Sequence, residues 1–127
     1  MMNSVWTDGA EKPNFPKLTK NIKTDVLIIG GGMAGLLCAY MLKEAGVDCV
    51  LVEAKQICSG ITKNTTAKIT LQHGLLYDKL IKRFGKENAL LYFEAQKAAC
   101  DKYALLCDGI RCDYEEKDAF VYSTDDK

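Results

Sequence analysis

The chain has 127 residues, which suits one ordinary domain or a part of a larger one. Its composition, 48% hydrophobic and 27% charged, is that of a soluble globular protein with enough apolar residues for a core. Seventeen basic and seventeen acidic residues give a formal net charge of zero, so we expect neither nucleic acid nor a membrane surface as a partner.

Residues 1–23 show no apolar periodicity and are predicted to form an irregular leader, which Trp6, Phe15 and Leu18 are placed to anchor to the rest of the protein. The leader is polar and contains both prolines of the chain, unlike a signal or transit peptide. No apolar run approaches the length of a membrane span. We therefore expect a cytoplasmic protein.

The next segment alternates between strand and helix signals. Residues 25–29 are an apolar run rich in β-branched residues, and three consecutive glycines follow at once, as after a buried parallel strand. Good helix formers occupy residues 33–45, and Gly46 stands where a helix C-terminal glycine belongs. Residues 49–52 are a second apolar run, which ends on Glu53. This order predicts an α/β fold with a Rossmann-like βαβ unit and parallel strands.

The second half of the chain is predicted to be mainly helical. A loop rich in Ser, Gly, Thr and Asn comes first. Helices are then expected over residues 75–84 and 86–107, with Gly85 between them. Strand-like stretches follow at residues 111–114 and 120–122.

The glycines after the first strand form a GxGxxG pattern. Gly30 allows the tight turn, Gly32 lets the backbone approach a pyrophosphate, and Gly35 permits close contact between helix and strand. Amides at the start of the helix, around Met33 and Ala34, lie at the positive end of the helix dipole and favour a phosphate. The pattern alone is weak, because a glycine-rich turn without a ligand explains it equally well.

Further positions favour a bound dinucleotide. Ala39 is a small residue where the helix must pack closely on the sheet, and Gly46 stands at the end of the helix. Glu53 follows Gly35 by eighteen residues, close to the expected offset of about 20. The Glu53 carboxylate can accept both ribose hydroxyls of an adenosine and would repel a 2′-phosphate, which argues against NADP. The βαβ core by itself does not separate FAD from NAD.

The sequence around this core resembles the FAD-dependent oxidoreductases of the D-amino-acid oxidase (DAO) type, which include glycine and sarcosine oxidases. The resemblance rests on residues 25–35, 51–54 and 60–68. It implies FAD as the cofactor and a truncated FAD-binding unit, with residues 24–107 as the N-terminal part of the FAD-binding domain. Residues 108–127 would then be the incomplete beginning of a substrate domain.

The same resemblance implies which residues contact FAD. The residues that match the pyrophosphate turn are Gly30, Gly32, Met33, Ala34 and Gly35. Glu53 and Ala54 match the ribose end. The loop along the ribityl chain and flavin is matched by Gly60, Thr62, Thr65, Thr66 and Ala67. Without the resemblance, the threonine cluster is better explained as a polar surface loop.

A closer likeness is to a bacterial subgroup of this family with a C-terminal Rieske iron–sulfur domain. It rests on Trp6, Phe15-Pro16 and the series at residues 65–70, 72–74 and 76–77. It implies a possible iron–sulfur domain in a longer parent protein. The chain itself has no Rieske-type Cys-His pairs to hold such a cluster.

For the parent, the resemblance implies oxidation of a small amine or amino acid, with hydride transfer to flavin N5. No catalytic side chain is assigned within these 127 residues. The alternative is an NAD-binding or non-catalytic dinucleotide-binding module. A third hypothesis is that the parent passes electrons through an iron–sulfur centre.

The thiols and the single histidine are expected to be structural. None of the six cysteines forms a CxxC pair, and His73 has no metal-ligand spacing to them, so no metal site is predicted. Reduced core thiols are the simplest interpretation, with redox or metal-binding roles as the alternatives.

Members of the family are several times longer than this chain, so we expect it to be part of a longer protein. A parallel sheet needs both faces covered and its edges paired. The isolated chain is therefore expected to bind FAD weakly and to self-associate.

Overall fold

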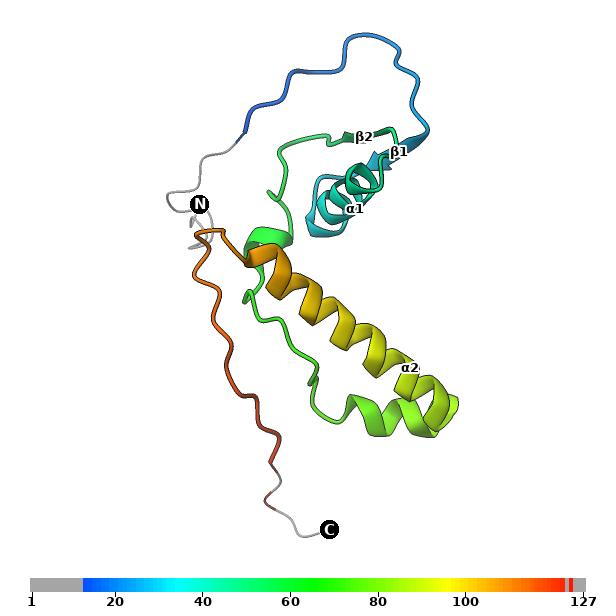
Figure 1. Ribbon diagram of the computed structural model, residues 1–127, viewed down its shortest axis with the longest axis vertical. Helices are drawn as coiled ribbons and strands as arrows, with labels where there is room; N and C mark the ends of the chain where they lie inside the picture. Colours follow the sequence, from blue (N-terminus) through cyan, green and yellow to red (C-terminus); the bar gives the residue numbers. More distant parts are fainter. Residues whose placement is uncertain (1–12, 123, 125–127) are drawn as a thin grey trace. The chain divides into compact units, whose positions relative to one another are not determined.

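The computed structural model describes residues 13–122 and residue 124, so the predicted role of Trp6 lies outside the described residues. The chain divides into two compact units, Met1–Ala67 and Lys68–Lys127, and each is described by itself. The first unit carries the βαβ segment, and the second carries the long helix (Figure 1).

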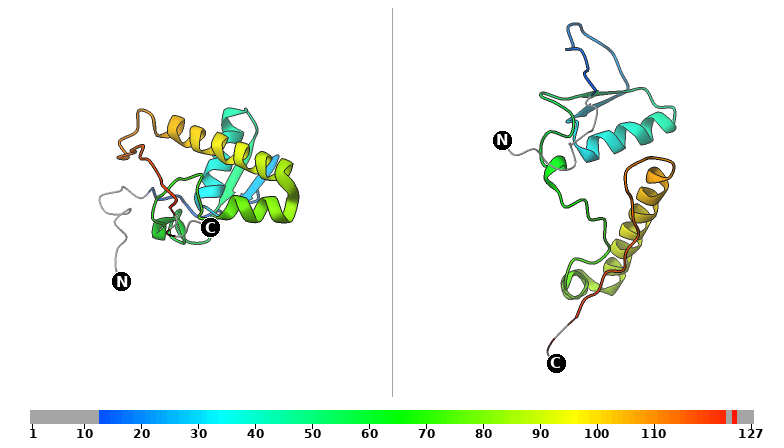
Figure 2. Two further views of the ribbon diagram at one scale, coloured as in Figure 1. Left: turned by 90° about the horizontal axis from the view of Figure 1, so that it is seen from below. Right: turned by 90° about the vertical axis from the view of Figure 1, so that its left-hand side faces the viewer.

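The first unit contains a parallel βαβ arrangement, as the sequence predicts. Strand β1 (Val26–Ile29) leads through the glycine turn into α1 (Met33–Glu44), and β2 (Cys49–Val52) follows. The two strands pair in parallel, from Val26 opposite Cys49 to Ile29 opposite Val52. Helix α1 lies alongside both strands (Figures 1 and 2). The fold is therefore mixed α/β and contains a Rossmann-like unit.

One face of the two-stranded sheet is covered and the other is open. Successive side chains of a strand point to opposite faces. Ile28 is buried toward α1, with its Cγ2 atom 3.5 Å from where a β-carbon on Gly35 would lie. Leu27 and Ile29 point the other way and are 56% and 82% exposed. Apolar strand residues thus remain uncovered by the described residues of this unit.

Helix α1 ends with the glycine that the sequence predicts. Ala45 is the C-cap, and Gly46 adopts a left-handed conformation with φ of 71°. The Gly46 amide donates to Lys43 O, and the Val47 amide donates to Leu42 O. These bonds satisfy carbonyls that the helix end would otherwise leave without partners.

The second unit is built on α2 (Leu76–Cys107), which Gly85 interrupts. Gly85 has φ of 82° and ψ of 163°, far from helical values, so the two predicted helices with a break between them are confirmed. The Tyr77 ring lies edge-on to the rings of Tyr92 and Phe93, at centroid distances of 6.2 and 5.8 Å. The break therefore turns the first helical segment against the second.

The strands predicted at residues 111–114 and 120–122 are wrong, because these residues form no strand in the structure. A strand is stable only when another strand pairs with it. In the described part of this unit, no other strand is available. The Cys112 amide instead donates to Ile110 O at 2.9 Å, in a turn that follows α2.

No helix in the part of the chain that the structure describes combines the length and the apolar character that crossing a membrane requires.

Candidate dinucleotide-binding site

The turn between β1 and α1 begins at Gly30. Its amide donates a 2.8 Å hydrogen bond to Val52 O, which extends the pairing of the two strands by one residue. Its φ of 105° lies in a region that residues with side chains rarely adopt. The sequence prediction that Gly30 makes a tight turn agrees with this geometry.

Gly35 lies where α1 passes closest to the end of β1. A β-carbon at this position would stand 2.0 Å from Gly30 O, inside any tolerable contact distance. Because this atom belongs to the backbone, it cannot move aside as a flexible side chain would. Gly35 is thus required for close approach of helix and turn, as the pattern predicts.

The N-terminus of α1 points its amides toward the loop that follows β2. Gly32 is the N-cap residue and has no side chain to cap the helix, and the first turn, all of which is described, has no acidic side chain. The Met33 amide donates a 3.2 Å hydrogen bond to Thr62 Oγ1. Since the first amides of a helix lack partners within the helix, this end favours an anion or another oxygen acceptor.

Glu53 follows β2 and its carboxylate is held against the glycine turn. Its Oε2 accepts a 2.8 Å hydrogen bond from the Gly31 amide, and its Oε1 accepts one of the same length from the Lys55 amide. Both hydrogen bonds lower the pKa of the Glu53 carboxyl below its ordinary value, and the bond from the Gly31 amide has the larger effect. The exposed carboxylate therefore stays ionised, and each oxygen keeps acceptor capacity for a hydroxyl.

Gly31 is a site residue that the sequence interpretation missed. It is buried, and a β-carbon there would lie 2.8 Å from Ile57 Cγ2 and 3.2 Å from Glu53 Cβ. Its carbonyl oxygen accepts a 2.8 Å hydrogen bond from the Cys58 amide. The sequence feature that could have identified Gly31 is the unbroken run of three glycines. The GxGxxG pattern accepts any residue at the middle position of that run.

The loop predicted to follow FAD makes most of its described hydrogen bonds within itself. Thr65 Oγ1 donates to Thr62 O and accepts from the Ala67 amide, each at 3.3 Å, and Gly60 O accepts from Asn64 Nδ2 at 3.3 Å. A single 3-10 turn at Thr62–Asn64 lies within this loop. The structure brings Thr62 to the start of α1, whereas Ala54 and Thr66 are exposed.

The histidine and the cysteines lie outside this turn or at its edge. His73 is exposed in the second unit. All six cysteines are free thiols. Within the described ranges, no cluster of three or more His, Cys, Asp or Glu side chains is placed to hold a metal ion.

Comparisons with known proteins agree with this geometry. The model of the family described as "FAD dependent oxidoreductase" (DAO) matches residues 25–127. A Bacillus subtilis protein, YhfW, whose name assigns it to Rieske 2Fe-2S iron–sulfur proteins, is 41% identical over 125 residues, or 97% of this chain and 25% of its own length. Gamma-glutamylputrescine oxidoreductase of Escherichia coli is 30% identical over 128 residues, or 97% of this chain and 30% of its own length.

The chain thus spans between a quarter and a third of the length of these two relatives. No solved structure matches it. The family is FAD dependent, so FAD is the cofactor that the family match supports. The family match covers well over half of the sequence, and the chain therefore belongs to the DAO family of FAD-dependent oxidoreductases.

Proposed function

We propose that this chain binds the ADP part of FAD, at the turn between β1 and α1, in a flavoprotein that oxidises a small amine or amino acid. The observation that carries the proposal is the Glu53 carboxylate, fixed by the Gly31 amide at 2.8 Å beside the N-terminus of α1. This arrangement puts an acceptor for ribose hydroxyls next to donors for a pyrophosphate.

Gly32 supports the assignment of the pyrophosphate position. A β-carbon there would meet Thr62 Oγ1 at 3.5 Å, an ordinary contact, and Gly32 has no left-handed φ. Packing within the protein therefore does not require glycine at this position. Close approach of a ligand to the backbone does require it, and this is the role that the GxGxxG pattern gives to Gly32.

The proposed contacts follow the chain along the cofactor. The turn and the amides of α1 bind the pyrophosphate, Glu53 and Ala54 bind the ribose end, and the loop after β2 follows the ribityl chain and flavin. The loop residues assigned to this last role are Gly60, Thr62, Thr65, Thr66 and Ala67. When bound, FAD supplies the hydride acceptor, and the residues of this chain bind it and orient it.

The proposed substrate class is supported by the name of one relative. The Escherichia coli protein is named as an oxidoreductase of gamma-glutamylputrescine, which carries an amine. We propose that the longer protein takes a hydride from a carbon next to an amine nitrogen. No side chain of the described residues is assigned to that step.

YhfW supports a further part of the proposal. Its name describes a Rieske iron–sulfur protein, and 97% of the present chain aligns with it. We propose that the longer protein carries an iron–sulfur domain outside this chain. We also propose a cytoplasmic location for the protein. For the isolated chain, we propose self-association through the open face at Leu27 and Ile29.

The experiment that tests FAD binding separates the two halves of the cofactor. FAD is titrated into the purified chain while flavin fluorescence anisotropy is recorded, and ADP, FMN and NAD are then added as competitors. If the proposal is correct, ADP displaces FAD at a lower concentration than FMN does, because the turn and Glu53 contact the ADP part and only the loop after β2 contacts the flavin part. Binding of NAD with no binding of FAD would instead establish the NAD-binding alternative.

A second readout tests the redox role. Absorbance of the retained flavin is recorded before and after addition of a reductant, and again after exposure to air. Bleaching followed by recovery supports a flavoprotein oxidoreductase. No change in flavin anisotropy at saturating FAD would overturn the assignment for this chain.

A further inference from the structure

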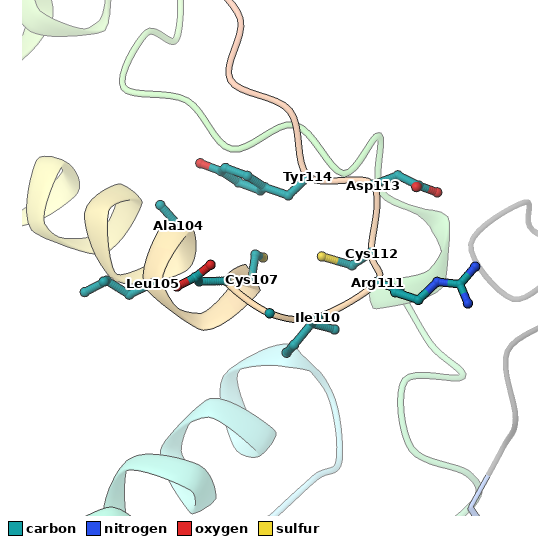
Figure 3. Close-up of a pocket in the computed structure, with 10 residues that line it drawn as sticks. Ala104, Leu105, Cys107, Ile110, Arg111, Cys112, Asp113 and Tyr114 are labelled. Carbon is teal, nitrogen blue, oxygen red and sulfur yellow. The ribbon is translucent and has the colours of Figure 1, made fainter.

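Two cysteines meet where α2 ends. Cys107 is the last residue of the helix, and the chain turns back so that the sulfur of Cys112 faces that of Cys107 (Figure 3). Gly109 makes this turn with φ of 74°. The Ile110 amide donates to Cys107 O at 3.1 Å, which holds the turn closed. Both cysteines line one surface pocket at this end of the helix.

The two thiols differ in environment. Cys112 is exposed, whereas Cys107 is half-buried. Burial raises the pKa of the Cys107 thiol, and its hydrogen bond to Cys112 raises it further. Cys112 is thus the more accessible of the two sulfurs.

We propose that Cys107 and Cys112 are a redox-active dithiol that a hydroperoxide converts reversibly to a disulfide. The turn after α2 places the two sulfurs face to face (Figure 3), and both residues line one pocket. Both cysteines lie within the second compact unit.

The chemistry balances with hydrogen peroxide as the oxidant. The Cys112 thiolate sulfur attacks one peroxide oxygen, the O–O bond breaks, and hydroxide leaves with a Cys112 sulfenic acid as the product. The Cys107 sulfur then attacks the Cys112 sulfur, an S–S bond forms, the S–O bond breaks, and water leaves. The hydroxide takes up the proton that the Cys112 thiol released on ionising and becomes water. The two thiols lose two electrons and the peroxide gains two, with two waters formed in total.

The position of Arg111 makes the disulfide easy to detect. Trypsin cleaves after Lys102, Arg111 and Lys117, so the two cysteines fall in separate peptides, residues 103–111 and 112–117. The reduced full chain is treated with hydrogen peroxide, free thiols are alkylated, and the digest is analysed by mass spectrometry. We expect these two peptides to be joined, and dithiothreitol to separate them.

Single-cysteine variants test the assigned roles. In Cys107→Ser, Cys112 should accumulate as a sulfenic acid that dimedone traps, because the second thiol is missing. In Cys112→Ser, Cys107 should react about tenfold more slowly with peroxide than Cys112 does in the parent chain. Cys38→Ser, which removes another exposed thiol, serves as the control and should leave the joined peptides unchanged.

The proposal is overturned if peroxide joins other cysteines in place of this pair, or if the pair is joined only after denaturation. It is also overturned if Cys112 is oxidised no faster than Cys38, since simple exposure would then account for its reactivity. Circular dichroism of each variant before oxidation ensures that the comparison is made between folded chains.

Discussion

The Gly31 amide and the Glu53 carboxylate are joined by a 2.8 Å hydrogen bond across 22 positions of the sequence. This bond ties the end of β2 to the turn that follows β1. The carboxylate is therefore oriented by the protein before any ligand arrives, which lowers the cost of binding. A second bond, from the Lys55 amide, fixes the other carboxylate oxygen.

Glu53→Gln should weaken FAD binding by about tenfold, because the side-chain amide keeps the size of the carboxylate and removes its charge from the hydrogen bonds. Fluorescence titration of the chain with FAD measures the change in Kd. Glu44→Gln, at the end of α1, is the matched control and should leave Kd unchanged. Equal Kd values for Glu53→Gln and the parent chain would contradict the ribose assignment.

The ionisation of Glu53 predicts a loss of stability in acid. Its pKa in the folded chain is lowered, chiefly by the Gly31 amide and next by the Lys55 amide, from an ordinary value of 4.5. A lowered pKa means that the charged form stabilises the fold above pH 4.5 and that this contribution disappears as pH falls through the folded pKa. The difference in Tm between the parent chain and Glu53→Gln should therefore shrink below pH 4.5. A difference that is constant across this range would contradict the prediction.

The sequence predicts the βαβ unit because its signals are local. Apolar runs, the glycine turn and Gly46 each specify their own conformation within a few residues. The bond between Gly31 and Glu53 depends instead on how two distant segments meet, so the pattern left Gly31 without a role. The prediction of strands after residue 110 was wrong for a related reason, since apolar and aromatic residues form a strand only beside a partner strand, which a local pattern does not specify.

The loop after β2 also makes a contact with a distant segment that the sequence did not predict. The resemblance assigns Thr62 to the side of the cofactor near the flavin, and the structure places its hydroxyl on the Met33 amide. The 3-10 turn that begins at Thr62 brings this about. A local pattern of threonines and glycines does not specify such a contact.

Thr62→Val should destabilise the first unit by about 1 kcal/mol, because the Met33 amide loses its oxygen acceptor at a helix N-terminus. Thr62→Ser keeps the hydroxyl and is the control, with a stability close to that of the parent chain. Urea denaturation followed by circular dichroism measures both. If the serine variant is as unstable as the valine variant, the hydroxyl is not the stabilising group.

Gly35→Ala should prevent correct packing of α1 on the sheet, at a cost of about 3 kcal/mol or more, since the new methyl group would stand 2.0 Å from Gly30 O. Gly60→Ala is the control for stability, because a β-carbon there meets no atom within 4 Å and no left-handed φ is required. Its stability should change by at most about 0.5 kcal/mol. Thermal melts of the two variants make the comparison, and similar Tm values would mean that α1 lies farther from the turn.

Gly85→Ala tests the break in α2. With φ of 82° and ψ of 163°, Gly85 occupies a region that is nearly exclusive to glycine, so alanine should cost about 1 to 3 kcal/mol. The alternative for the variant is to continue the helix through residue 85, which would separate Tyr77 from Tyr92 and Phe93. We therefore expect a lower Tm, a rise in helical circular dichroism and a change in tyrosine fluorescence. Lys86→Ala, at the next exposed position, should alter none of these, and an unchanged tyrosine signal in Gly85→Ala would show that the ring contacts do not depend on the break.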